Sequence, residues 1–194
     1  NPLQISAAVY NEAQILAQPA FSTDKNFLYV AHRDGNLYKV DISGAAAQVV
    51  WTWTQPALDY EFYSMPLVIW DAVAGRDVIY FTSTKEAGNR KGRIYAVEDL
   101  GLSGSLKWTY PSQLNPPIST PFSTMKPSHA EIEGTNLVFV INNNGILYGV
   151  DLDGELKKTF TADPVNYGPD HKIISSTTVA DYGGKTYVYT VANQ

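Results

Sequence analysis

Three stretches of the chain repeat one pattern, and this repeat constrains the fold more strongly than any other feature. Each copy reads as an apolar strand, a polar turn that contains Gly, and a second strand of the form x-[LI]-Tyr-x-Val-[DE]. The copies are Phe27–Asp41, Val78–Glu98 and Leu137–Asp151. Self-similarity at a period of about 50 residues indicates one supersecondary unit that recurs along the chain.

The sequence around each copy extends the unit to four strands. An aromatic segment follows each copy at the same place, and these segments are Trp51–Trp53, Trp108–Tyr110 and Lys158–Phe160. Upstream, a first strand that starts with Pro is expected at QPAF, MPLV and TPFS, which begin at Gln18, Met65 and Thr120. Pro is tolerated there because the start of a strand needs no ladder bond from its missing N–H. The strands of the first unit are expected at 18–22, 26–31, 36–41 and 48–53.

A fourth unit begins near the end of the sequence. Ser176–Val179 fits its first strand and Thr186–Ala192 its second, and Tyr189 aligns with Tyr29. The turn Gly of this unit would fall one position after Gln194. A second strand without its partner exposes edge hydrogen-bonding groups. We therefore expect remaining blades or a partner chain to complete the structure.

Together these patterns predict an all-β fold, a β-propeller of four-stranded antiparallel blades. The chain 1–194 is expected to form a single propeller segment with about three and a half blades, which is a partial ring. The blades are expected at 15–55, 62–111, 117–162 and, as a part only, 172–194.

Composition excludes several classes of function. The net charge of −5 argues against a nucleic-acid partner, which requires a basic face. The chain has no Cys, so disulfides, thiolate metal sites and cysteine nucleophiles are excluded. No apolar run approaches the ~18 residues that a membrane helix needs. The aromatic share of 12% suits strands, which offer a half-buried pleated surface.

The pattern G-x-[LI]-Y-x-V-D, followed by a turn and W-x-[WYF], resembles the pyrroloquinoline-quinone-like (PQQ-like) β-propeller repeat. The copies that carry the resemblance are Gly35–Asp41, Gly92–Glu98 and Gly145–Asp151 with their aromatic segments. WD40 and kelch blades are disfavoured, because neither the Gly-His…Trp-Asp signature nor a Gly-Gly pair at a blade start is present.

The resemblance implies two kinds of function. Quinoprotein dehydrogenases of this family use PQQ, calcium and a carboxylate base, often beside a vicinal cysteine pair. The BamB-type scaffold of outer-membrane protein assembly and many extracytoplasmic sensor and adhesion domains are not enzymes. This sequence lacks Cys, and Asp41–Gly44 and Asp151–Glu155 match only the centre of the dehydrogenase docking repeat. The BamB-like branch is therefore favoured, with no catalytic, cofactor-binding or metal residue predicted.

Isolated motifs favour structural roles over chemistry. Asp151, Asp153 and Glu155 are spaced as in a calcium loop, but the rest of an EF-hand is missing, so a turn between strands is expected. The chain has three histidines, His32, His129 and His171, and they are too far apart in the sequence for the usual spacing of zinc ligands. The carboxylates Asp59 and Glu61 suit an inter-blade loop better than the paired acids of a glycosidase.

The aromatic segments are expected to pack between blades, since each sheet must bury a face. Trp70 breaks the repeat and is placed in an extended connection between the first two strands of its unit. The second copy also carries an insertion of basic residues on an acidic protein. This insertion is the candidate interaction loop, with Lys85, Arg90, Lys91 and Arg93 as its cations. A solubilising hairpin tip is the competing interpretation.

The favoured function is a non-catalytic binding or scaffold module that contacts a protein or a glycan. Its expected location is periplasmic, cell-surface or secreted. One alternative is a fragment of a PQQ-dependent oxidoreductase, with quinone and calcium at the ring centre. Another is a structural subunit of a cell-surface or filament assembly, in which neighbouring chains cover the open edges.

Overall fold

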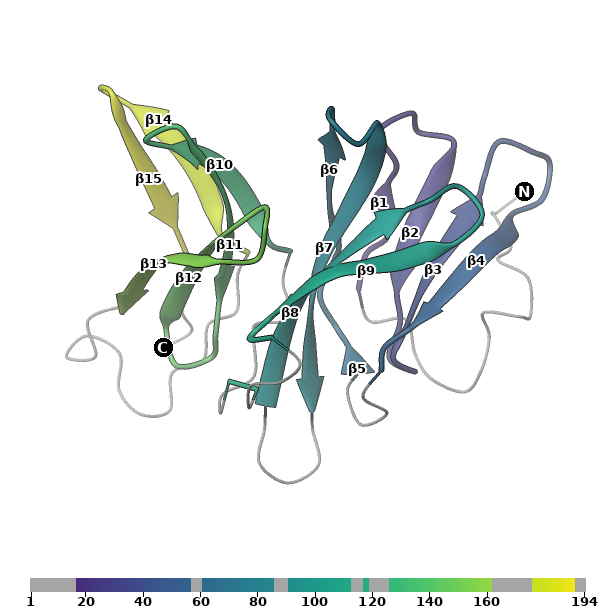
Figure 1. The fold of residues 1–194 in the computed structure, drawn as a ribbon, viewed down its shortest axis with the longest axis horizontal. Coiled ribbons are helices and arrows are strands. Elements are labelled where there is room, and N and C mark those ends of the chain that lie inside the picture. Colours follow the sequence, from purple (N-terminus) through teal and green to yellow (C-terminus); the bar gives the residue numbers. More distant parts are fainter. Residues whose placement is uncertain are drawn as a thin grey trace.

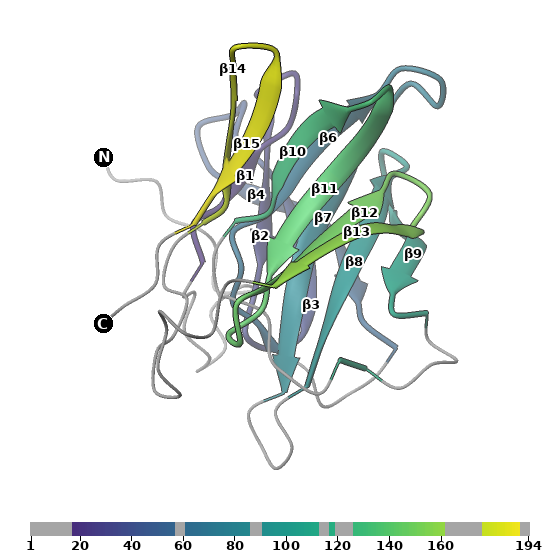
Figure 2. The ribbon, with the colours of Figure 1, turned by 90° about the vertical axis from the view of Figure 1, so that its left-hand side faces the viewer.

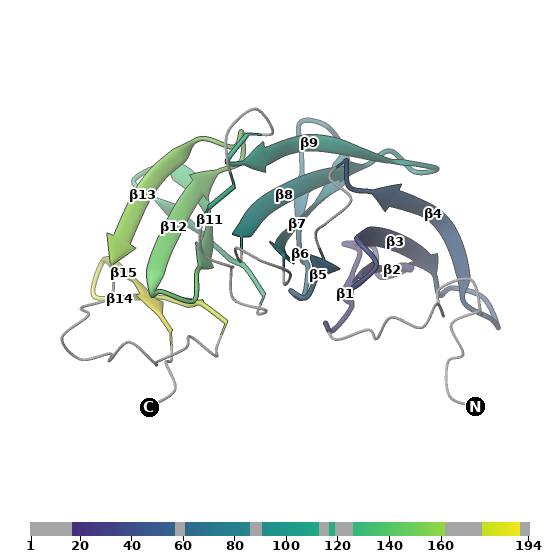
Figure 3. The ribbon, with the colours of Figure 1, turned by 90° about the horizontal axis from the view of Figure 1, so that it is seen from below.

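The computed structural model describes residues 17–56, 61–85, 91–112, 117–118, 126–161 and 176–190. The described residues form fifteen strands and no helix, arranged as successive antiparallel sheets that fan out along an arc (Figures 1 and 3). Among them, no helix has the length and the apolar character needed to cross a membrane. The all-β partial propeller predicted from the repeat is therefore confirmed.

Each of the first three sheets is one blade. The first holds β1 (Ala20–Phe21), β2 (Phe27–Ala31), β3 (Asn36–Asp41) and β4 (Gln48–Thr54) in chain order. The second holds β5 (Glu61–Phe62), β6 (Leu67–Asp71), β7 (Arg76–Lys85), β8 (Lys91–Asp99) and β9 (Gly104–Tyr110). The third holds β10 (Ser128–Ile132), β11 (Thr135–Ile141), β12 (Ile146–Asp151) and β13 (Leu156–Thr161).

The fourth sheet is the hairpin of β14 (Thr178–Tyr182) and β15 (Lys185–Tyr189), which lies beside β10 (Figure 2). Its register confirms the alignment of the repeat. Tyr29 pairs with the first residue of β1, and Tyr189 pairs in the same way with the first residue of β14. Tyr80 and Phe139 hold the corresponding positions in the second and third blades.

Two local expectations were wrong. TPFS lies outside the described residues, and the strand that pairs with β11 as the first strand of the third sheet is β10, which begins at Ser128, directly after Pro127. Pro19 and Pro66 directly precede β1 and β6 in the same way, so the pairing with the next strand selects the later proline. Trp70 does not lie in a connection but inside β6, where it pairs with Asp77 of β7.

Among the described residues, two of the three buried apolar clusters lie between neighbouring blades, and the third lies on the other face of the first sheet. Alternate residues of β7 face opposite neighbours. Ile79 and Phe81 pack with the first blade, and Val78 and Tyr80 pack with the third. Trp53 of β4 stacks on Phe62 of the second blade at 6.4 Å between ring centroids. The first two aromatic segments therefore pack between blades, as predicted, whereas Phe160 of the third is exposed.

The fourth blade leaves one face open. By register, the position of Tyr29, Tyr80 and Phe139 faces the following blade, and all three side chains are buried. Tyr189 holds that position in β15 and is 53% exposed, and it stacks on the neighbouring Tyr187. The structure thus presents an arc of blades whose last described sheet has an uncovered aromatic face.

Candidate functional site

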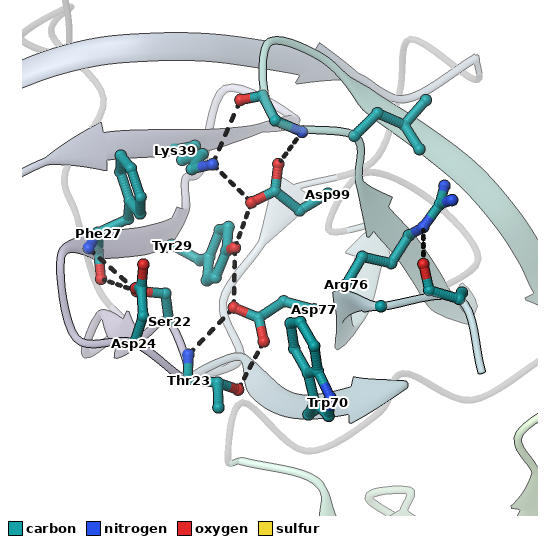
Figure 4. A pocket seen from close by; sticks show the side chains of 14 residues that line it. Ser22, Thr23, Asp24, Phe27, Tyr29, Lys39, Trp70, Arg76, Asp77 and Asp99 are labelled. Atoms are coloured by element: carbon teal, nitrogen blue, oxygen red, sulfur yellow. Dashed lines mark hydrogen bonds and ion pairs between the residues drawn. The ribbon is translucent and has the colours of Figure 1, made fainter. Parts of the chain in front are cut away.

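A pocket of about 840 Å³ lies between the first and second blades (Figure 4). The first blade lines it with the β1–β2 turn at Ser22–Asp24 and the side chain of Lys39 on β3. The second blade lines it with the β6–β7 hairpin, from Trp70 to Asp77, and with the β8–β9 turn at Asp99–Gly101. Its volume lies within the range of about 300–1,000 Å³ that is typical of ligand pockets.

Asp99 joins the two blades at the base of this pocket. Its Oδ2 lies 2.6 Å from Nζ of Lys39, and it also accepts a hydrogen bond of 2.6 Å from the hydroxyl of Tyr29. Its Oδ1 accepts from the indole N–H of Trp51 at 3.1 Å and from the backbone N–H of Gly101 at 2.8 Å. Three side chains of the first blade thus converge on one carboxylate of the second.

Lys39 is buried, and its ammonium group is well compensated. Besides the bond to Asp99, Nζ donates to the carbonyl oxygen of Gly101 at 3.2 Å. The same atom lies 3.9 Å from the centroid of the Phe27 ring, within the distance of a cation–π interaction. The ammonium is therefore a structural cation that anchors β3 to the second blade.

Asp77 is the second carboxylate of the network, and it binds the β1–β2 turn. Its two oxygens accept from the backbone N–H and the hydroxyl of Thr23, at 3.1 Å and 2.5 Å. Tyr29 lies between the carboxylates, with its hydroxyl 3.1 Å from Asp77 Oδ2 and 2.6 Å from Asp99 Oδ2. Since a phenol has one proton, the shorter bond identifies Asp99 as its acceptor.

The network perturbs the ionisation of its members. Burial and the adjacent carboxylates raise the pKa of Tyr29, so the hydroxyl stays protonated. Burial by itself raises the pKa of Asp99, but the hydrogen bonds from Lys39, Tyr29, Gly101 and Trp51 together outweigh it and lower that pKa below its ordinary value. The hydrogen bond from Ser22 is the main reason that the pKa of Asp24 is lowered.

We expect these carboxylates to make the fold sensitive to acid. Their pKa values are lower in the folded chain than the value of about 3.9 for an unfolded Asp, so the unfolded chain binds more protons as the pH falls. Stability present at neutral pH should be lost progressively below about pH 5. Urea unfolding measured between about pH 7 and pH 3 checks this, and Asp99→Asn should show a shallower decline. An unchanged free energy of unfolding across that range would contradict it.

The rim of the pocket offers groups that the network does not use. Trp70 is 51% exposed, and its ring lies beside the Asp77 carboxylate (Figure 4). Arg76 donates through Nε to the carbonyl oxygen of Ala74 and lies 3.8 Å from Glu98. These side chains place an aromatic face, a guanidinium group and the Asp24 carboxylate around one opening.

The pocket residues depart from the repeat. By strand register, Asp77 corresponds to Asn26 in the first blade and Asn136 in the third, and Trp70 corresponds to Glu131. Lys39 corresponds to Ala96 and Gly149. Positions that build the blades are alike, whereas these pocket positions are particular to one junction. Departures from a structural consensus concentrate at functional sites.

The predicted interaction loop is described only in part, and its described residues Lys91 and Arg93 do not line this pocket. Arg90 and the side chain of Lys85 lie outside the described residues. Lys91 is half-buried and pairs with Lys85 along the β7–β8 ladder, so the insertion lengthens a hairpin. Arg93 is buried, and its guanidinium donates to the carbonyl oxygens of Pro111 and Ser112 at 2.6 Å and 2.7 Å. Arg93 therefore holds the chain after β9.

The other sequence motifs have structural roles. Asp151 Oδ1 accepts from the backbone N–H groups of Asp153 and Glu155, which confirms the predicted turn. His32 is buried at the end of β2, 2.9 Å from Asp34, and His129 contacts Asn136. Glu61 belongs to β5 rather than to a loop, and it accepts from Arg33 and Tyr63.

His171 and Asp59 lie outside the described residues. In the described ranges, no group of three or more His, Cys, Asp or Glu side chains could hold a metal ion.

Sequence reasoning did not identify Asp99, because the repeat aligns Glu98 with Asp41 and Asp151. The turn carboxylate of the second blade is displaced by one residue, so that Asp99 rather than Glu98 caps the β8–β9 turn. Asp77 was also missed. The signal available for the pocket was Trp70, whose departure from the repeat is visible in the sequence.

Comparison with known proteins identifies the architecture. No protein-family model matches the sequence, and no curated protein matches it at a significant level. The structure is similar to BamB from Moraxella catarrhalis, with a TM-score of 0.60 and 17% identity over 94% of this chain and 49% of that chain. It is also similar to the β-propeller domain of Myceliophteria thermophila Cps50 (Swd1), with a TM-score of 0.52 and 12% identity over 93% and 54%.

A third similar structure is the C-terminal WD40 domain of Sif2, with a TM-score of 0.51 and 13% identity over 92% of this chain and 46% of that chain. The chain therefore spans about half the length of the solved structures it matches. At such low identities the likeness concerns the fold alone, and it includes both BamB and WD40 propellers. The chain is part of a β-propeller.

Proposed function

We propose that this chain is a binding or scaffold segment of a PQQ-like-repeat propeller, that it works without catalysis, and that it acts in the periplasm, at the cell surface or after secretion. The partner class is a protein or a glycan. The repeat Gly35–Asp41, with its copies and their aromatic segments, supports the repeat type. The likeness in fold to BamB supports the propeller architecture of the proposal.

One observation carries the binding function. The inter-blade pocket combines a rigid base with an open rim of residues that the repeat does not require. Asp77 and Asp99 accept hydrogen bonds that hold the two blades together, so the base is preorganised. Trp70 is exposed and Arg76 is partly exposed, and both line the pocket. Binding sites on repeat scaffolds have this form, a fixed framework with variable surface residues.

The uncovered aromatic face of the fourth blade supports a further part of the proposal. Tyr189 is exposed where its three counterparts are buried against the next blade. Further blades of the same repeat type would cover it, and the solved propellers that the chain matches are about twice as long. The segment then acts within a larger ring, and its pocket belongs to one junction of that ring.

A titration followed by NMR tests the binding function. The probes are a pool of neutral oligosaccharides, a pool of extended peptides, and pyrroloquinoline quinone with calcium. We expect at least one pool to shift the indole N–H resonance of Trp70 and the backbone resonances of Asp77 and Gly101. Shifts that avoid the pocket, or saturable quinone binding seen in the absorption spectrum, would contradict the proposal, and the latter would favour the oxidoreductase alternative.

A further inference from the structure

The geometry points to a carbohydrate site: the pocket between the first two blades binds a neutral oligosaccharide, with Trp70 as the stacking surface. This inference rests on the proposed binding function and names the ligand class of the same site. Three features of the pocket support it: its aromatic wall, the balance of charge at its rim, and the preorganised polar groups behind both.

The aromatic wall is the first feature. Trp70 lies within a paired strand, yet 51% of its surface is exposed. Leaving so large an apolar side chain in water gives up the stabilisation that burial provides. The pairing with Asp77 fixes the backbone that carries the indole. A flat apolar face held in this way suits the C–H face of a pyranose ring.

The charge balance is the second feature, and it selects a neutral ligand. Asp24 and Arg76 both line the opening and carry opposite charges. Deeper in the pocket, Lys39 neutralises Asp99, and Asp77 adds a further negative charge. An anion would meet Asp24 and Asp77, and a cation would meet Arg76. A ligand with hydroxyl groups can instead donate to carboxylates and accept from the guanidinium without bringing a charge of its own.

The third feature is the restraint on the polar groups. Thr23 donates both its backbone N–H and its hydroxyl to Asp77, which leaves the hydroxyl oxygen able to accept. The backbone N–H and the side-chain amide of Asn26 donate to the Asp24 carboxylate, as does the hydroxyl of Ser22, and together they orient it. Because these groups are already ordered, binding loses little side-chain entropy, which favours ligands that make many weak polar contacts.

Calorimetry with defined tetrasaccharides tests this proposal. The probes are the neutral tetrasaccharides of cellulose, chitin, mannan, starch and laminarin, with an oligogalacturonate as the anion and a chitosan oligomer as the cation. We expect at least one neutral probe to bind more tightly than both charged ones. Trp70→Ala should weaken that binding about tenfold or more, and Trp70→Phe should restore part of it.

Tyr182→Ala is the matched control, since Tyr182 is exposed at the end of β14, a strand that lies at the other end of the arc from the first two blades (Figure 1). Its affinity should equal that of the unsubstituted chain, and circular dichroism should show that all variants are folded. If no neutral probe binds, or if Trp70→Ala binds as well as Tyr182→Ala does, the carbohydrate assignment is wrong. Pocket shifts with the peptide pool would then preserve the binding function, whereas no shift with either pool would overturn both.

Discussion

Replacing Asp99 with Ala is expected to lower the free energy of unfolding by about 3–5 kcal/mol. The substitution leaves the ammonium group of Lys39 buried without its counterion, and removing one partner of a buried pair is costly for this reason. It also removes the acceptor of Tyr29 and of the Trp51 indole, both within the same junction. Urea unfolding of the 194-residue chain, followed by far-UV circular dichroism, measures the loss.

Two further variants show whether the cost arises from the cross-blade network. Asp41 caps the corresponding turn of the first blade from a half-buried position, and among the described residues its carboxylate accepts from Ser43 alone. Asp41→Ala should therefore cost much less than Asp99→Ala. Combining Asp99→Leu with Lys39→Met removes both charges and should recover part of the stability. Equal losses for Asp41→Ala and Asp99→Ala would show that turn capping, not the network, dominates.

The second large effect is expected at Trp53, where truncation to Ala should cost about 3–5 kcal/mol. The indole is buried between the first and second blades, stacked on Phe62 and edge-on to Phe81 and Tyr95. Its removal leaves a cavity at the centre of that interface, and the rigid sheets on either side can close it only in part. The midpoint and slope of urea unfolding provide the measurement.

The repeat supplies an internal control for this substitution. Phe160 occupies the same register position in β13, opposite Leu147, as Trp53 does in β4, opposite Leu37. It is 52% exposed, so Phe160→Ala should cost at most about 1 kcal/mol. A loss at Phe160 as large as that at Trp53 would contradict the exposed position of Phe160 on the third sheet.

The fold could be predicted from the sequence because the same four-stranded unit is encoded three times, so that each copy supports the interpretation of the others. Gly35, Gly92 and Gly145 locate the turns, and the alternation of Leu37, Tyr38 and Lys39 gives the strand period. Where the sequence offered two equivalent signals, the prediction could fail. Pro121 and Pro127 are both plausible strand starts, and only the pairing of Ser128 with Phe139 decides between them.

The pocket could not be predicted in the same way. Its contacts join residues that are far apart in the chain, such as Thr23 with Asp77, 54 positions away, and Tyr29 with Asp99, 70 positions away. A repeat identifies what the blades share, whereas these residues are what distinguishes one junction from the next. The sequence did mark Trp70 as an exception, but the partner positions become visible only when neighbouring blades are placed side by side.

The second blade contributes opposite faces of one sheet to two separate cores. Ile79 and Phe81 belong to the first core, and Val78 and Tyr80 belong to the second. The stability of each sheet therefore depends on its own residues and on its interfaces with the sheets directly beside it. The second sheet can open only by disrupting both cores, while β14–β15 can open at the cost of one. Local opening should consequently start at the fourth sheet and reach the second sheet last.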